Sequence, residues 1–140
     1  MEYLYYVFSI VIQPRFEDTD FHEHIDNAAV AHWFETARNP LLKHFVPDRS
    51  IKMRTLPLFM AHTDYDFEKA LSLKYEVEIR TWITHIGINS FTIYHEAWQK
   101  KRLCAKGSAV IVHYDFKAGK STSLPEEKIK FLIEHLKTEE

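Results

Sequence analysis

Alternating apolar and polar residues predict five β-strands. The first prediction covers residues 3–14, a stretch rich in Tyr, Val, Ile and Phe that ends at Pro14. In residues 58–67 the alternation places five side chains on one side: Phe59, Ala61, Thr63, Tyr65 and Phe67. The next strand is expected to turn Tyr75, Val77 and Ile79 inward and its charged residues outward. Two further strands are expected at 88–99 and 103–116, joined by a charged hairpin tip at 100–102.

A period of 3.6 residues begins at Asn27 and predicts a long helix with one buried face. Its apolar stripe consists of Val30, Trp33, Phe34, Ala37, Leu41 and Phe45. Asp26 stands at the N-cap position, and Pro40, which has no N–H, is expected to kink or end the helix near Asn39. Residues 123–126 have the spacing of a capping box and predict a short second helix. The apolar stripe of that helix would be Ile129, Leu132, Ile133 and Leu136.

This order of elements predicts a single α+β domain over residues 1–140. No further helices are available to connect parallel strands, so the sheet is expected to be antiparallel. Wrapping five strands around the long helix would bury the apolar stripe on the concave face of the sheet. The outer edge of such a sheet stays open, and an open edge invites pairing with a second copy. We therefore expect a homodimer or a homotetramer.

Composition and charge exclude several classes of function. The 140 residues carry 18 Lys and Arg against 20 Asp and Glu, a net charge of −2 that disfavours a nucleic-acid binder. Only 3 glycines leave little room for phosphate-binding loops. The single Cys104 fits a reducing compartment, which makes a cytoplasmic location the expectation. The apolar stretch at residues 3–14 is too short to span a membrane and lacks the basic flank of a signal peptide.

Residues 18–27 hold the densest group of polar side chains, between the first strand and the long helix. Backbone N–H groups at the start of a helix have no intrahelical acceptor, and the helix dipole favours negative charge there. Such a helix end can act as an oxyanion hole, and a carboxylate beside it is a candidate base or nucleophile. These features by themselves do not select a reaction.

Other polar residues have simpler interpretations. Asp18 is expected to be a turn carboxylate that accepts local backbone N–H groups, and Glu35 with Arg38 an i,i+3 ion pair at the surface or an interface. His22 and His24 alternate with acids, but such side chains in one short loop rarely converge on one ion, so we expect no metal. The basic tip at 100–102 is expected to be solvated, with contact to a cofactor phosphate as the less favoured alternative.

Three stretches of sequence resemble one family motif. Residues 15–20 (RFEDTD), 24–27 (HIDN) and 33–38 (WFETAR) match R-x-x-D-T-D-x-x-G-H-V-N-N-x-x-Y-x-x-W-F-E-x-A-R without gaps. That motif is typical of hotdog-fold acyl-CoA thioesterases of the 4-hydroxybenzoyl-CoA thioesterase type. Residues 86–91 (IGINSF) and Leu124-Pro125 also resemble the family pattern. The resemblance implies a sheet wrapped on a central helix, pairing across a dimer, and hydrolysis of acyl-CoA, with CoA as part of the substrate and no separate cofactor.

The resemblance also implies roles for individual residues. Asp20 corresponds to the catalytic carboxylate, which acts as nucleophile or general base, and the backbone amide of Asn27 corresponds to the oxyanion donor. The spacing of Asp20, His22 and His24 is similar to an Asp-x-Asn-x-His arrangement in related acyl carrier protein thioesterases, which makes His24 a second candidate and an acyl carrier protein a second possible partner.

Three positions depart from the family motif. Glu23 replaces a Gly, Asp26 replaces the first Asn, and Val30 replaces a Tyr. Glu23 adds a negative charge beside a site that would stabilise an oxyanion. The alternative hypothesis is therefore a non-catalytic dimeric protein that binds acyl-CoA or an acyl carrier protein on the same scaffold.

Overall fold

The computed structural model describes residues 8–20, 22, 24–46 and 56–137. The strands are β1 (Phe8–Ile12), β2 (Leu58–Phe67), β3 (Val77–Ile86), β4 (Ser90–Gln99), β5 (Arg102–Asp115) and β6 (Lys120–Ser121). The α-helices are α1 (Asn27–Leu42) and α2 (Glu126–Glu134), and 3-10 turns lie at Phe16–Asp18 and Lys43–Phe45. The part of the predicted first strand before residue 8 falls outside the described residues. None of the helices in the described part of the chain is long and apolar enough to cross a membrane.

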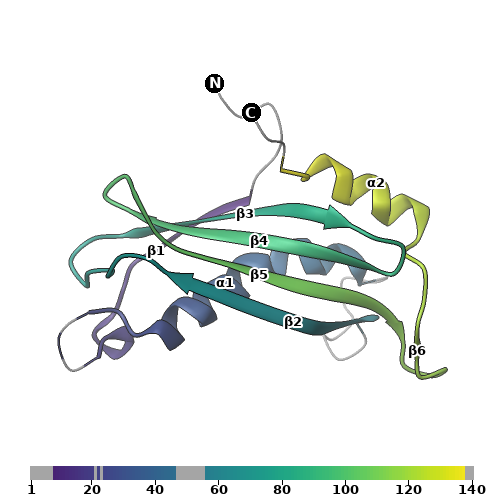
Figure 1. Cartoon of the computed structure of the whole chain (residues 1–140), viewed down its shortest axis with the longest axis horizontal. Coiled ribbons are helices and arrows are strands. Elements are labelled where there is room, and N and C mark those ends of the chain that lie inside the picture. Colours follow the sequence, from purple (N-terminus) through teal and green to yellow (C-terminus); the bar gives the residue numbers. More distant parts are fainter. Residues whose placement is uncertain (1–7, 21, 23, 47–55, 138–140) are drawn as a thin grey trace.

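The strands form one antiparallel sheet with the order β1-β3-β4-β5-β2, and the two-residue β6 pairs with the end of β5. The curved sheet has α1 against one of its faces, while α2 lies near β3 at the end of the sheet (Figure 1). The predicted α+β architecture is therefore confirmed. The short β6 was not predicted, because two residues carry no measurable alternation.

The apolar stripe of α1 packs against small residues of β5. Val30, Trp33, Phe34, Ala37 and Leu41 are all buried, as predicted. Alternate positions of β5 on this side of the sheet are Ala105, Gly107 and Ala109, which leave room for the helix to approach.

One part of the alternation predicted for residues 58–67 is wrong. A shift of register between Met60 and His62 reverses the alternation there, so that Met60 approaches α1 while Phe59 packs edge-on against Tyr114 at 5.1 Å. Phe59 and Ala61 are consequently exposed.

Three further details of the prediction are wrong. The helix α1 does not end near Asn39, one of the two outcomes expected there, but continues past Pro40 to Leu42, because the residues that follow this exposed proline are buried in the core. Tyr75 is 44% exposed, since it precedes β3 and lies beside the ammonium group of Lys100, 4.3 Å from the ring centre. The N-cap of α2 is Pro125, which has no side chain able to accept a bond, so the capping box does not form, and Ile133 of the predicted stripe is exposed.

The close approach of α1 to the sheet gives a first testable prediction. A Cβ atom added at Gly107 would lie 2.8 Å from the backbone oxygen of Asp64 and 3.0 Å from Cε2 of Phe34. Gly107→Ala should therefore lower the free energy of unfolding by about 1–3 kcal/mol, measured by urea denaturation, because backbone and ring must shift. Gly87→Ala is the matched control, since its nearest contacts would be at 3.4 Å. Equal stability of the two variants would contradict the packing described here.

Candidate functional site

The loop between β1 and α1 is fixed by Asp18. Its Oδ2 accepts the backbone N–H of Arg15 at 2.8 Å, and its backbone oxygen accepts the N–H of Asp26 at 2.7 Å. Asp18 is buried and makes the turn contacts predicted for it. These contacts fix the loop to Asp26, the residue directly before the helix.

Asp20 occupies a tight turn in the same loop. Its Oδ1 accepts the backbone N–H groups of His22 at 2.8 Å and His24 at 3.1 Å, and its own N–H donates to the backbone oxygen of His24 at 2.8 Å. The N–H of His22 is the main cause that lowers the pKa of Asp20 below its ordinary value, because it stabilises the charged form. The carboxylate is therefore both oriented and ionised at neutral pH.

The start of α1 presents a backbone N–H beside this carboxylate. Asp26 caps the helix as predicted, with Oδ1 accepting the N–H of Ala28 at 3.2 Å, and its backbone oxygen accepts the N–H of Ala29 at 3.0 Å. Asn27 is the first helical residue, so its N–H has no acceptor within the helix, and no hydrogen bond joins it to another described residue. This N–H is available to an oxyanion.

A pocket of about 230 Å³ brings Asp20, His24 and Asn27 together. Its other lining residues come from the loop before α1, from α1 itself, from the end of β2 and the segment that follows it, and from β5: Ile25, Val30, Phe67, Glu68, Lys69, Ala70, Leu71 and Ala105. All three residues proposed from the sequence thus line one pocket. An acidic residue and the first residue of a helix in one pocket can supply a carboxylate and a backbone N–H to a bound carbonyl group.

The sequence did not indicate the wall formed by residues 67–71. This wall is positioned by long-range backbone bonds, from Lys69 N–H to the oxygen of Cys104 at 3.0 Å and from Ile25 N–H to the oxygen of Leu71 at 3.1 Å. Neither pairing has a local sequence signal, because each depends on where distant strands meet.

His24 contributes mainly through its backbone. It forms an isolated bridge with Ser72, in addition to its contacts with Asp20, and its side chain is exposed at the rim of the pocket. Its place next to Asp20 fits a residue that orients the loop.

Glu35 and Arg38 do not form the predicted ion pair. The structure buries Arg38, only 3% exposed, whereas Glu35 points to solvent and lies 3.6 Å from His32. The guanidinium Nη1 of Arg38 is 3.2 Å from Nε2 of His95, whose Nδ1 is 2.9 Å from the hydroxyl of Thr81. Burial lowers the pKa of His95 to about 3, so the imidazole is neutral and can accept from the arginine.

This outcome has a geometric reason. Arg38 follows Phe34 by four residues and therefore lies on the inward face of α1, not on its surface. Neither Arg38 nor His95 lines the pocket. The pair is a polar element of the core.

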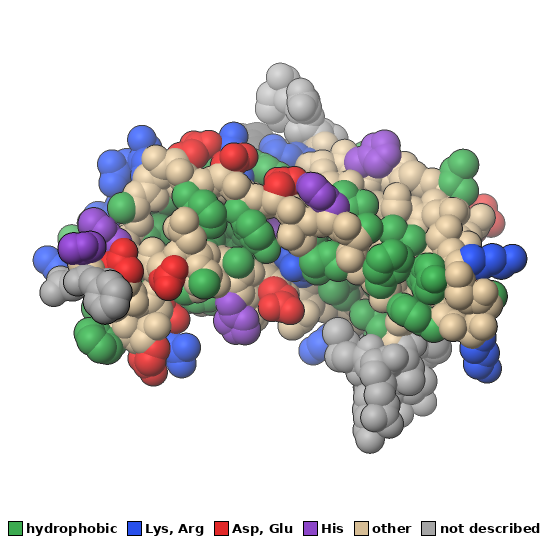
Figure 2. All heavy atoms as spheres, turned by 60° about the horizontal axis from the view of Figure 1, so that its bottom comes forward, with side chains coloured by type: hydrophobic (Ala, Val, Ile, Leu, Met, Phe, Trp, Pro, Cys, Tyr) green, Lys and Arg blue, Asp and Glu red, His purple; other side chains and the backbone are tan. Residues whose placement is uncertain are grey.

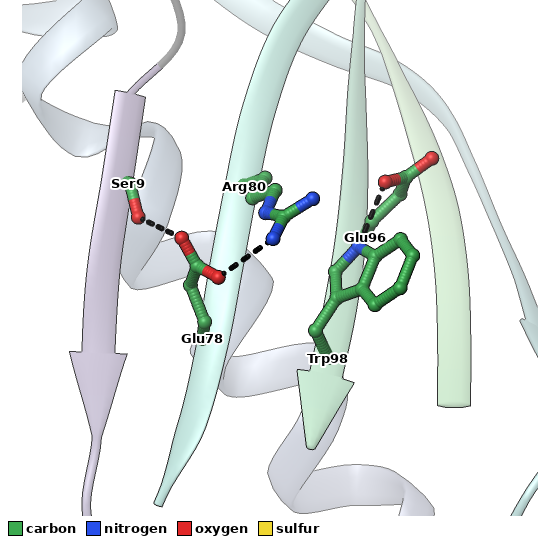
Figure 3. Close-up of polar contacts among 5 residues, drawn as sticks. All are labelled: Ser9, Glu78, Arg80, Glu96 and Trp98. Carbon is green, nitrogen blue, oxygen red and sulfur yellow. Dashed lines mark hydrogen bonds and ion pairs between the residues drawn. The ribbon is translucent and has the colours of Figure 1, made fainter. Parts of the chain in front are cut away.

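A separate polar network covers the other face of the sheet. Glu78 accepts from Ser9 at 2.8 Å and from Arg80 at 3.0 Å, and the guanidinium of Arg80 lies 4.6 Å from the ring centre of Trp98 (Figure 3). Trp98 in turn donates to Glu96 at 2.9 Å. These side chains join β1, β3 and β4, and none of them lines the pocket, so we assign them to the stability of the sheet.

The basic hairpin tip is well defined. Lys100 and Lys101 have φ angles of 54° and 65°, the left-handed conformation of a two-residue type I′ turn, and Arg102 already belongs to β5. The tip does not line the pocket that contains Asp20.

Comparison with known proteins places the chain in a family. The family model of the thioesterase-like superfamily matches residues 14–132, so the chain belongs to that superfamily. A predicted thioesterase from Bacillus stearothermophilus is 31% identical, with a TM-score of 0.88 over 96% of this chain and 100% of that one. The hotdog fold expected from the motif is thereby confirmed. No curated protein sequence matches the chain at a significant level.

Two further solved structures share the fold. A thioesterase from Thermus thermophilus, complexed with coenzyme A and Zn, is 24% identical, with a TM-score of 0.77 over 90% of this chain and 96% of that one. A Staphylococcus aureus protein in complex with CoA is 15% identical, with a TM-score of 0.82 over 100% of this chain and 92% of that one.

The arrangement of histidines and acids gives a second testable prediction. Within the described residues no three His, Cys, Asp or Glu side chains are grouped so that they could hold a metal ion. We expect treatment with EDTA, followed by gel filtration, to leave the melting temperature and any thioester hydrolysis unchanged. Loss of a stoichiometric metal together with loss of activity would contradict this expectation and move His22 and His24 to the centre of the site.

Proposed function

Because the chain belongs to the thioesterase-like superfamily, we propose that it hydrolyses acyl-CoA thioesters at the pocket that contains Asp20. One observation carries the proposal: Asp20, with its ionised carboxylate, and Asn27, the first residue of α1, line the same pocket. Coenzyme A bound to the Thermus thermophilus and Staphylococcus aureus proteins of the same fold supports CoA as the carrier of the acyl group. The lone, buried Cys104 is consistent with a cytoplasmic enzyme.

In the proposed reaction the amide of Asn27 stabilises the negative charge that develops on the thioester oxygen. Asp20 acts in one of two ways. As a nucleophile it forms a bond to the carbonyl carbon while the C–S bond breaks, which gives an acyl-enzyme anhydride and CoA thiolate, and water then hydrolyses the anhydride. As a general base it removes a proton from a water molecule that attacks the same carbon. Both routes yield a carboxylic acid and free CoA.

One oxygen of Asp20 is available for either route. Only Oδ1 is engaged by other described residues, which leaves Oδ2 free to approach the carbonyl carbon or a water molecule. The lowered pKa of Asp20 keeps the carboxylate ionised at neutral pH, which both routes require. His24 holds Oδ1 through its backbone and orients the loop.

The central role of Asp20 is tested by Asp20→Asn, which keeps the size of the side chain and removes its charge. Hydrolysis of an acyl-CoA panel, followed by release of free thiol, should fall by about 10²–10⁴-fold or more. Substrate binding should persist, because the amide of Asn27 and the helix dipole are unchanged. In the control variant His24→Ala the loss should be smaller, since its backbone contacts remain.

The outcomes separate the hypotheses. Wild-type turnover in Asp20→Asn with inactive His24→Ala would contradict the assignment of Asp20. Acyl-CoA binding without any turnover by the wild-type protein would favour the non-catalytic binder. The same panel with acyl carrier protein thioesters distinguishes the two carriers.

We further propose that two copies assemble through β2. Among the described strands β2 has only β5 as a neighbour, so one of its edges is unpaired. Its exposed apolar side chains include Phe59, Met60 and Phe67. Strand β2 forms the lower edge of the sheet in Figure 1, and Figure 2, which turns that edge toward the viewer, shows hydrophobic side chains gathered on this face. Antiparallel pairing around a two-fold axis would bring Phe59 of one copy toward Phe67 of the other, at the pocket.

Light scattering tests this assembly. The wild-type protein should have the mass of a dimer or a tetramer at micromolar concentration, and Phe59→Lys should shift it toward the monomer. Ile88→Lys is the matched control, because Ile88 is also exposed but lies in the turn between β3 and β4. A monomeric wild-type protein would defeat this part of the proposal.

A further inference from the structure

We infer that Val30 and Ala105 set the size limit of the acyl group, so that the substrates are thioesters of short acyl chains. The inference rests on the proposed function, because it names the substrate class of the same pocket. It is carried by the volume of the pocket and by the packing of its floor.

The volume of about 230 Å³ is small for a ligand site. Cavities that bind drug-sized molecules measure about 300–1,000 Å³, and a cavity of about 150 Å³ accommodates benzene. Within one copy of the chain the pocket therefore has room for a group somewhat larger than one benzene ring. A long fatty acyl chain would have to displace protein side chains, and the nucleotide part of CoA must lie outside.

The floor of the pocket is part of the close-packed core. Val30 and Ala105 are each 1% exposed, and both belong to one cluster with Trp33 and Cys104. Leu71, 4% exposed, belongs to the same cluster and also lines the pocket. Because protein cores are packed as densely as organic crystals, this floor does not yield to a longer chain without repacking.

The polar groups lie at the opening. Asp20, Asn27, Glu68 and Lys69 are exposed, and Glu68 forms an ion pair with Lys106 at 3.2 Å. This arrangement places the thioester carbonyl at the rim, the acyl group toward Val30 and the CoA thiol toward solvent.

Val30 and Ala105 are the small side chains of the floor and therefore the positions where size can change. Val30 comes from the first turn of α1, and Ala105 from β5, where it pairs with Phe67 and Ala97. A smaller side chain at position 30 deepens the pocket, and a larger one at position 105 shortens it.

Selectivity for chain length tests the inference. For the wild-type protein, kcat/KM should be at least ~10-fold higher for butyryl-CoA than for decanoyl-CoA and lower still for palmitoyl-CoA. Val30→Ala should raise the ratio of decanoyl to butyryl by about 10-fold, and Ala105→Val should lower it. The matched control is Val77→Ala, because Val77 is a buried valine of the same core cluster that does not line the pocket. It should lose similar stability and keep the wild-type ratio.

The possible results separate this inference from the proposed function. If palmitoyl-CoA is hydrolysed as efficiently as butyryl-CoA, or if Val77→Ala shifts the ratio as much as Val30→Ala, the size limit is wrong and the thioesterase proposal stands. If no acyl-CoA is hydrolysed, the proposed function fails. Calorimetry with the thioethers S-butyl-CoA and S-decyl-CoA then decides the size limit: tighter binding of the butyl compound supports it, and equal affinity overturns it.

Discussion

The packing of one face of α1 on the concave side of the sheet is the constraint on which the other features depend. Burying a side chain such as Phe34 or Leu41 contributes about 1.5–3 kcal/mol, and the stripe contains several of them. This packing requires the backbone of β5 to lie close to the helix, which explains Gly107 beneath the ring of Phe34. Once the helix is seated, the position and direction of its first turn are determined.

The candidate site follows from that first turn. Asp26 satisfies the N–H of Ala28, and Asp18 holds the N–H of Asp26, so the chain enters the helix along one defined path. In the loop before the helix, the carboxylate of Asp20 is held by two backbone N–H groups. Asp20 and Asn27 are thus brought to one pocket by backbone structure, with little dependence on flexible side chains.

The sequence predicted those features that depend on local chemistry. The helix start, the capping by Asp26 and the alternation in β3 to β5 are encoded within a few residues of where they act. Features that depend on distant contacts were missed: the wall at residues 67–71, the bulge of β2 near Ala61 and the continuation of α1 past Pro40. In each case packing against another element outweighs the local preference.

Arg38 is another residue whose position could not be predicted from local sequence, and its burial requires polar partners inside the core. Its spacing from Glu35 suits a surface ion pair, but its position on the inward face places a guanidinium among apolar residues. The neutral ring of His95 and the thioether of Met60 contact its two terminal nitrogens, while its Nε is buried without a partner among the described residues. A buried cation is costly unless its donors are satisfied, so the hydrogen bond between His95 and Thr81 has a structural purpose: it orients the imidazole so that Nε2 accepts from Arg38. The inward face of α1 thus contacts the sheet in two ways. Val30, in the first turn, is an apolar residue of the pocket floor, and Arg38, further along the helix, makes a polar contact inside the core.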